Sequence, residues 1–127
     1  MNLRLEVNDI LKDYSEDAIE ATKEVVEKVA KESAKRLKSV SSEKFGSGKY
    51  ARGWTSTVEK TRLTVEGIVH GKSGTYQLAH LLEHGHVTRN GTGRTFAPTP
   101  AHPHIADVEE WANQKAYNDI MEKLEKI

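Results

Sequence analysis

Apolar and small residues recur every three or four positions along the first third of the chain. They are Val7, Ile10, Leu11, Tyr14, Ala18, Ala21, Val25, Val29 and Leu37. This spacing predicts one amphipathic helix from Val7 to about Val40. Ser15 is followed by two acids and is typical of a helix start, so we allow a kink between Asp13 and Glu16. The Ser- and Gly-rich stretch Ser39–Lys49 has no apolar period and predicts a connection that ends the helix.

Apolar and polar positions alternate in the next region of the chain. Tyr50–Glu59 and Arg62–His70 therefore predict a β-hairpin that turns at Lys60-Thr61. The second strand presents one apolar face, made of Leu63, Val65, Gly67 and Val69. We expect Trp54 and Val58 to extend this face on the first strand. Because a lone hairpin is marginally stable in water, the long helix is expected to cover it.

A short helix and a polar hairpin are predicted further along. Tyr76–Leu82 carries leucines at helical spacing, and Gly85 is a stop signal that can adopt the left-handed cap conformation. Asn90-Gly91 favours a tight turn between Val87–Arg89 and Arg94–Phe96, which predicts a second, exposed hairpin.

Three prolines precede the last predicted element. Pro98, Pro100 and Pro103 prevent regular structure until Ile105, and apolar residues then recur at helical spacing up to Ile127. The 127 residues suffice for one domain with one core. We therefore expect an α+β domain spanning 1–127, in which a long N-terminal helix and a C-terminal helix pack on a small antiparallel sheet of hairpins. Its segments are a helical N-terminal region over 1–45, a hairpin over 50–71, a short helix over 75–85, an exposed hairpin and loop over 86–104, and a helix over 105–127.

Composition narrows the function classes. Nineteen Lys and Arg balance nineteen Asp and Glu, so no net field attracts nucleic acid or an anionic membrane. DNA contact through Arg89 and Arg94 is expected to be incidental, because two charges give little affinity at physiological salt. The chain has no cysteine, which excludes disulfides, thiol catalysis and thiolate metal sites. No apolar run has the length of a signal peptide or a membrane span, so we expect a soluble cytosolic product without membrane contact.

The charges are sorted along the chain although their sum is zero. Lys49–Lys72 holds five cations and two acids, and His84–Ala106 holds two arginines and no acid. The C-terminal helix holds six acids against three lysines. Two interpretations are open: opposite charges pair neighbouring subunits head to tail, or they balance each other within one chain.

One motif suggests metal chemistry. His80, Glu83 and His84 spell H-x-x-E-H, in which two histidines one helical turn apart bind zinc and the glutamate acts as a general base in a small hydrolase. A third ligand is needed, and only Glu109 or Glu110 is available. Gly85 also ends the helix directly after the motif, which is a poor place to hold ligand geometry.

A simpler interpretation treats His80 and Glu83 as polar cover on a helix whose leucine face is buried. A structural metal site using His84, His86, His102 or His104 is a further option. We expect no catalytic residue, no cofactor and no bound metal, and we expect Trp54, Tyr76 and Trp111 to pack in the core.

From Ser47 onward the chain also resembles a known family. The order of SGKYARGW, a β-hairpin, YQLAHLLEHGH, a glycine-rich polar insertion and PHI before an acidic helix is similar to that of the small head-to-tail joining or tail-completion proteins of tailed bacteriophages and prophages. The most specific matching residues are Tyr76, Leu82, Glu83, Gly85 and His86, with Pro103, His104 and Ile105. Here His84 replaces the phenylalanine that is common in the family.

The resemblance implies a non-enzymatic neck component whose copies form a ring between the head and the tail tube. It implies other phage head or tail proteins as partners, and a location in the virion, with assembly in the host cytoplasm. The segment from 86 to 97 is the expected subunit interface. Its predicted contact residues are His86, Arg89, Asn90, Gly91, Arg94 and Phe96.

Overall fold

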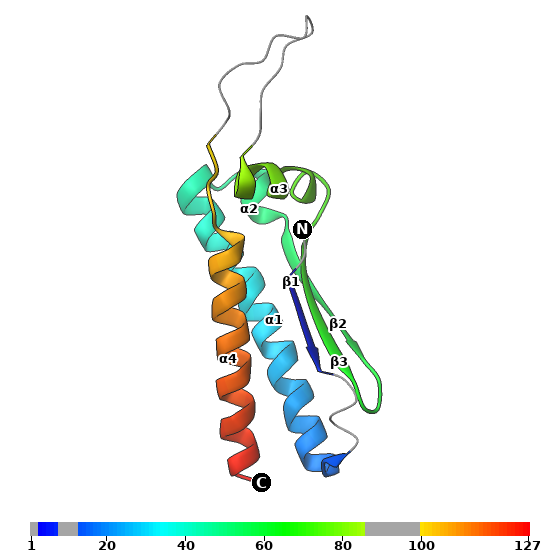
Figure 1. Ribbon diagram of the computed structural model, residues 1–127. Helices are drawn as coiled ribbons and strands as arrows, with labels where there is room; N and C mark the ends of the chain where they lie inside the picture. Colours follow the sequence, from blue (N-terminus) through cyan, green and yellow to red (C-terminus); the bar gives the residue numbers. More distant parts are fainter. Residues whose placement is uncertain (1–2, 8–12, 86–99) are drawn as a thin grey trace, which may run out of the picture.

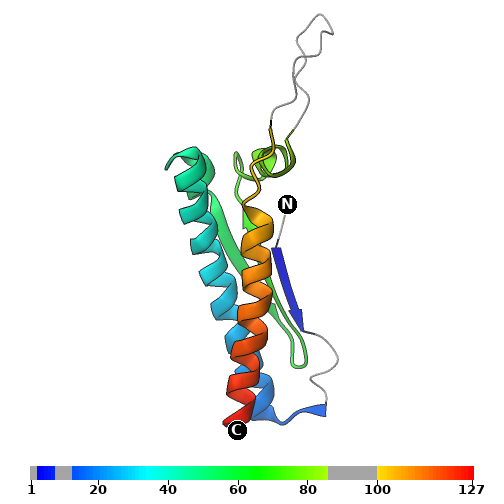
Figure 2. The same ribbon diagram turned by 60° about the vertical axis from the view of Figure 1, so that its left-hand side comes forward.

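Two long helices cover one face of a small sheet. The computed structural model describes residues 3–7, 13–85 and 100–127 (Figure 1). Its elements are β1 (Leu3–Val7), α1 (Glu16–Phe45), α2 (Lys49–Arg52), β2 (Trp54–Lys60), β3 (Val65–Gly71), α3 (Tyr76–His84) and α4 (Ile105–Glu125). The helices α1 and α4 lie side by side and run in opposite directions (Figure 2). The predicted α+β arrangement is confirmed.

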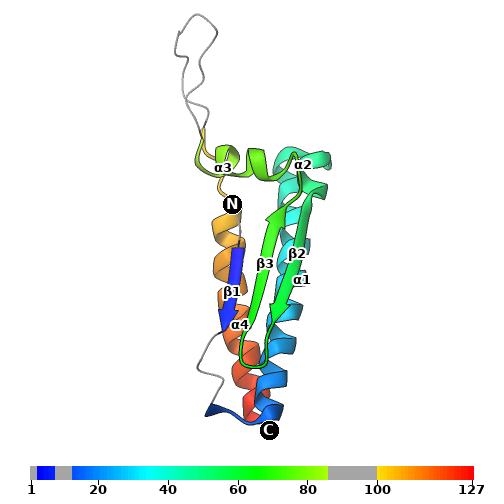
Figure 3. The ribbon, with the colours of Figure 1, turned by 90° about the vertical axis from the view of Figure 1, so that its right-hand side faces the viewer.

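The sheet has three antiparallel strands in the order β1-β3-β2. Figure 3 shows it in front of the two long helices. The register pairs Leu3 with Val69 and Val58 with Gly67. The prediction that Val7 belongs to a helix is wrong. The sequence LRLEV alternates apolar and polar residues with the period of a strand, and β3 provides a pairing edge for it.

Helix α1 begins where a kink was allowed. The Oγ of Ser15 accepts a hydrogen bond from the N–H of Ala18 at 3.2 Å, and two acids occupy the first turn. The prediction of a connection that starts at Ser39 is wrong, because α1 continues to Phe45, where the predicted helical region over 1–45 ends. Ser41 lies inside this last stretch, fully buried, and accepts a hydrogen bond from Nε1 of Trp54 at 3.1 Å. A tertiary partner thus stabilises a serine-rich turn that local propensity disfavours.

The hairpin is confirmed, but its first strand begins later than predicted. Lys49–Arg52 forms the short helix α2 in place of the expected start of a strand at Tyr50. Ala51 is buried in it, and the hydroxyl of Thr75 donates to the carbonyl of Tyr50 at 3.0 Å. These contacts hold α2 next to the start of α3.

The hydrophobic core lies between α1, α4 and the inner face of the sheet. Its buried members are Val25, Val26, Val29, Ala30, Ala34, Leu37, Trp54, Val65, Val69, Ala79, Ile105, Val108, Ala112 and Ala116. The predicted inner face of β3 is confirmed by Val65 and Val69, which are fully buried. Gly67 allows close approach of the helix, because a Cβ there would lie 3.0 Å from the Cβ of Ala30.

The three predicted core aromatics differ in outcome. Trp54 is buried, as predicted. Trp111 is partly buried, and the guanidinium carbon of Arg36 lies 3.7 Å from its ring centroid. The prediction for Tyr76 is wrong, since its side chain is 52% exposed. No helix within residues 13–85 and 100–127 combines the length and apolar character needed to cross a bilayer.

Candidate functional site

Helix α3 buries an acid and exposes leucines. Ala79 and Glu83 are its buried residues, whereas Leu78 and Leu81 are exposed. The expectation of a buried leucine face with Glu83 as polar cover is therefore wrong. The physical reason is a strong polar partner for Glu83 at the start of α4, which outweighs the gain from burying the leucines.

The Glu83 carboxylate caps the N-terminus of α4. Its Oε1 accepts hydrogen bonds from the N–H groups of His104 at 2.7 Å and Ile105 at 2.8 Å, and Oε2 accepts from Ala106 at 3.1 Å. The first N–H groups of a helix have no partner within the helix, and the cap residue His104 offers them no side-chain acceptor. A glutamate distant in sequence thus supplies the cap, and its charge complements the helix dipole.

The pKa of Glu83 reflects two opposing effects. Burial raises it, but the hydrogen bonds from Ile105, His104 and Ala106, with an electrostatic contribution from His104, together lower it by more, so the pKa lies below the usual value of a glutamate. The carboxylate is consequently ionised at neutral pH inside a buried site.

His104 links this cap to α2. It is fully buried, and its Nδ1 lies 2.8 Å from the His102 carbonyl and 3.1 Å from Oε1 of Glu83. Both of these oxygens only accept hydrogen bonds, so we assign a proton to Nδ1. Nε2 lies 2.6 Å from the Tyr50 hydroxyl. Burial and the Glu83 charge raise the pKa of Tyr50 far above its usual range, so the phenol keeps its proton and can donate it to Nε2.

Aromatic contacts enclose this cluster. The ring of Phe45 packs edge-on against those of Tyr50, His102 and His104, with centroids 5.1 to 5.8 Å apart. The N–H of His102 donates to the carbonyl of Leu82 at 2.7 Å. Backbone and side-chain hydrogen bonds therefore join the residues just before segment 86–99 to the residues just after it. We call this set, Leu82, Glu83, His102 and His104, the foot.

The structure does not describe the residues that the sequence predicts to form the interface. His86, Arg89, Asn90, Gly91, Arg94 and Phe96 lie outside the described residues. Gly85, which ends α3 and precedes them, has a φ of +73° and a ψ of 174°, so its backbone has the positive φ that favours glycine but not the predicted left-handed cap conformation. Its N–H donates to the carbonyl of Leu81 at 2.8 Å.

The geometry does not assemble the H-x-x-E-H motif as a catalytic site. His80 and His84 are exposed neighbours with ring centroids 4.8 Å apart, but the Glu83 carboxylate is buried at α4 and is fully engaged there. It is thus unavailable as a general base beside the histidines. Within residues 13–85 and 100–127, no three side chains of His, Asp or Glu converge as metal ligands.

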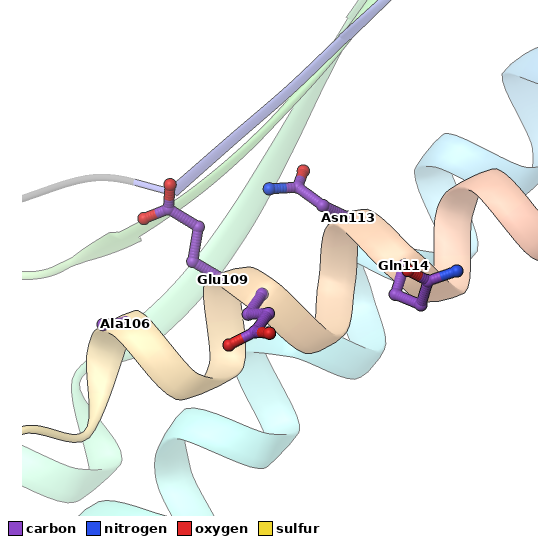
Figure 4. Close-up of a pocket in the computed structure, with 5 residues that line it drawn as sticks. Ala106, Glu109, Asn113 and Gln114 are labelled. Carbon is purple, nitrogen blue, oxygen red and sulfur yellow. The ribbon is translucent and has the colours of Figure 1, made fainter.

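The hollows on the described surface are shallow or filled with charge pairs. One of about 500 Å³ is lined by a single helix, through Ala106, Glu109, Glu110, Asn113 and Gln114. Figure 4 shows Glu109 and Asn113 projecting on the same side from successive turns of α4. Another, of about 460 Å³, lies between α1 and α4, where Lys123 pairs with Glu24 at 3.0 Å. Neither has the enclosed apolar walls of a small-molecule site.

Some of the charges that are unevenly distributed along the sequence form ion pairs within the chain. Lys60 pairs with Glu27 at 2.7 Å, and Arg62 lies 3.7 Å from Glu16, so cations of the hairpin meet acids of α1. On α4, Lys115 pairs with Asp119, and Lys126, just after the helix, pairs with Glu122. Other charges, among the residues that the structure describes, have no ion pair; they include Lys49, Arg52 and Lys72 near α3, and Glu109 and Glu110 on α4.

Comparison with known proteins places the chain in a family. The model of the family described as "Bacteriophage HK97-gp10, putative tail-component" matches residues 6–85. The match includes the N-terminal helix, which the resemblance from Ser47 onward does not cover, and stops before the second resembling motif at Pro103. No curated protein and no solved structure matches the chain. Because the matched region is well over half of the sequence, the chain belongs to the HK97-gp10-like family of bacteriophage tail components.

Proposed function

We propose that this protein is a non-enzymatic structural subunit of the phage neck or tail, which joins head to tail or completes the tail by forming an oligomeric ring. Its partners are other copies of itself and neighbouring head or tail proteins. It acts in the virion after assembly in the host cytoplasm. In this proposal, the segment 86–97 is a contact arm.

The foot is the observation that carries the proposal. A buried carboxylate, a buried imidazole and a backbone hydrogen bond from His102 to Leu82 hold the two ends of the segment together. Ordering buried polar groups in this way is costly unless every partner is satisfied, and no buried side-chain polar atom among the described residues lacks one. Such an anchored base suits a segment that transmits force or position between subunits.

The charge distribution supports the ring. A ring requires heterologous contacts, in which one patch meets a different patch on the next copy. The cations near α3 and the acids on α4 belong to different regions of one chain and have no ion pair with each other. Complementary charge of this kind sets orientation and register more than affinity.

The test replaces Val87–Phe96 by a short Gly-Ser linker, leaving the foot intact. We expect the thermal unfolding midpoint to stay near that of the wild type, because the core residues and the foot are retained. In a phage carrying the variant, heads and tails should accumulate unjoined, as counted by electron microscopy, and infectious particles should be lost.

A matched control replaces exposed cations elsewhere. Lys35→Glu with Lys38→Glu changes two exposed positions of α1, and these should leave particle yield unchanged. Normal joining by the linker variant would contradict the role of the arm. An unfolded linker variant would show instead that the segment belongs to the core.

A further inference from the structure

Two groups of large apolar side chains are partly exposed among the described residues. On α3, Leu78 and Leu81 are 45% and 36% exposed and lie one turn apart; we call them the α3 leucine face. On α4, Tyr117 and Met121 are 64% and 42% exposed; we call them the α4 outer stripe. Exposed apolar side chains that adjoin each other on one helix face are candidates for protein contact.

The α4 outer stripe is separate from the core-facing side of the same helix. The buried residues Ile105, Val108, Ala112 and Ala116 follow helical spacing along one side. At 100° per residue, Tyr117 and Met121 fall close to the opposite side. The second half of α4 is therefore apolar on two sides, and only one of them packs against α1 and the sheet.

The two surfaces cannot meet within one chain. Helix α3 lies at the end of the molecule where α4 begins, whereas the outer stripe lies in the half of α4 near the C-terminus (Figure 1). A contact between them therefore requires two copies. Such a contact is heterologous, as a ring requires.

The charges beside each surface favour this pairing. Lys72 precedes α3 at the basic end of the molecule, and Lys49 lies against Gly74 nearby. Glu110 lies about two turns before Tyr117 on the outward side of α4. A parallel alignment of α3 on a neighbour's α4 brings Lys72 towards Glu110 while the leucines reach Tyr117 and Met121. Pairing of two α4 outer stripes would not bring Lys72 or Lys49 towards Glu110.

We propose that the α3 leucine face of one copy docks on the α4 outer stripe of the next, with Lys72 near Glu110 of that next copy. The proposal deepens the proposed function and rests on it, since it names the two surfaces that join ring neighbours. It assigns them to the body of the subunit, apart from the arm.

Disulfide cross-linking tests the pairing in the full chain, which has no native cysteine. Leu81→Cys and Met121→Cys are made separately and together, and oxidised at concentrations up to about millimolar. Paired cysteines must bring their Cα atoms within about 7 Å, so the test is geometrically strict. We expect dimers from the mixture of single variants, and a ladder of dimers, trimers and larger species from the double variant. Lys38→Cys mixed with Met121→Cys is the control and should give only background.

Charge exchange tests the register. Lys72→Glu in the double-cysteine chain should reduce the ladder, and adding Glu110→Lys should restore it. Efficient dimers from Met121→Cys alone would overturn the proposal in favour of pairing between two outer stripes. No cross-link above the Lys38→Cys background would overturn it as well, including when the wild type is monomeric throughout. Either failure leaves the phenotype of the arm replacement untouched, so it is distinguishable from failure of the proposed function.

Discussion

Helices α3 and α4 distribute polar and apolar residues in opposite ways. Helix α4 buries an apolar stripe, from Ile105 to Ala116, against α1 and the sheet. Helix α3 buries Glu83 with Ala79 and exposes Leu78 and Leu81. Burial of apolar area holds α4 in place, whereas a charged hydrogen-bonded contact positions α3.

The difference shows that α3 is positioned mainly by its hydrogen bonds to the start of α4, and less by burial of apolar side chains in the core. A buried carboxylate is costly to desolvate, and it is retained only where enough donors compensate. Three backbone N–H groups at the start of α4 provide that compensation. The leucines of α3 are then left facing outwards, where they are available for contact with another protein.

The largest loss of stability is expected from a substitution on the buried apolar side of α4. Ile105→Ala removes a side chain that is 2% exposed and leaves a cavity between α4 and the rest of the core. We expect a loss of about 2 to 5 kcal/mol in the free energy of unfolding, measured by chemical denaturation. A loss below about 1 kcal/mol would mean that the site collapses around the smaller side chain and that α4 is less tightly packed than the structure indicates.

A smaller loss is expected at the polar contact of α3. Glu83→Ala leaves three N–H groups at the start of α4 without acceptors, and we expect it to cost about 1 to 3 kcal/mol in unfolding free energy. Glu83→Gln is the matched variant. Its amide oxygen can still accept from His104 and Ile105, but its NH2 group faces the N–H of Ala106, so the loss should be intermediate. Equal stability of all three chains would show that the cap contributes nothing.

The same contact predicts a pH dependence. The folded pKa of Glu83 is depressed, so its stabilising contribution is present above the unfolded pKa of about 4.3 and is lost as the pH falls through the folded pKa. The difference in unfolding free energy between wild type and Glu83→Gln should therefore shrink as the pH is lowered from about 6 towards about 3. A difference that stays constant over this range would contradict the ionised cap.

The sequence predicts the elements of the fold that depend on local periodicity. The alternation in Val65–Val69 predicts the inner face of β3, and the residues around Ser15 predict the start of α1. The strand β1 is not predicted although LRLEV alternates with period two, because Val7 also fits the helical period that follows. The secondary structure of a short segment that fits both periods depends on whether a pairing edge is available, and the edge of β3 is a tertiary feature that the local sequence does not show.

The foot escapes sequence prediction for a different reason. Glu83 and the N–H groups that it caps are 21 to 23 residues apart, and no local pattern links them. One signal is present in the sequence: α4 starts after Pro103-His104, without the Ser, Thr, Asp or Asn that usually caps a helix. A helix start without a local cap requires an acceptor from elsewhere in the chain. The sequence does not reveal that this acceptor is the glutamate of H-x-x-E-H.

The smallest effect is expected on the apolar side of α3. Leu81→Ala shortens a side chain that is 36% exposed and keeps good helix propensity, so the unfolding free energy of the isolated chain should fall by about 1 kcal/mol or less. The contrast with Ile105→Ala at the start of α4 measures the difference between the two helices directly. Self-association followed by light scattering should nevertheless weaken if the leucine face meets a neighbour. A loss of about 2 kcal/mol or more in the monomer would instead mean that the same chain covers this face in solution, and the leucines would then belong to the fold.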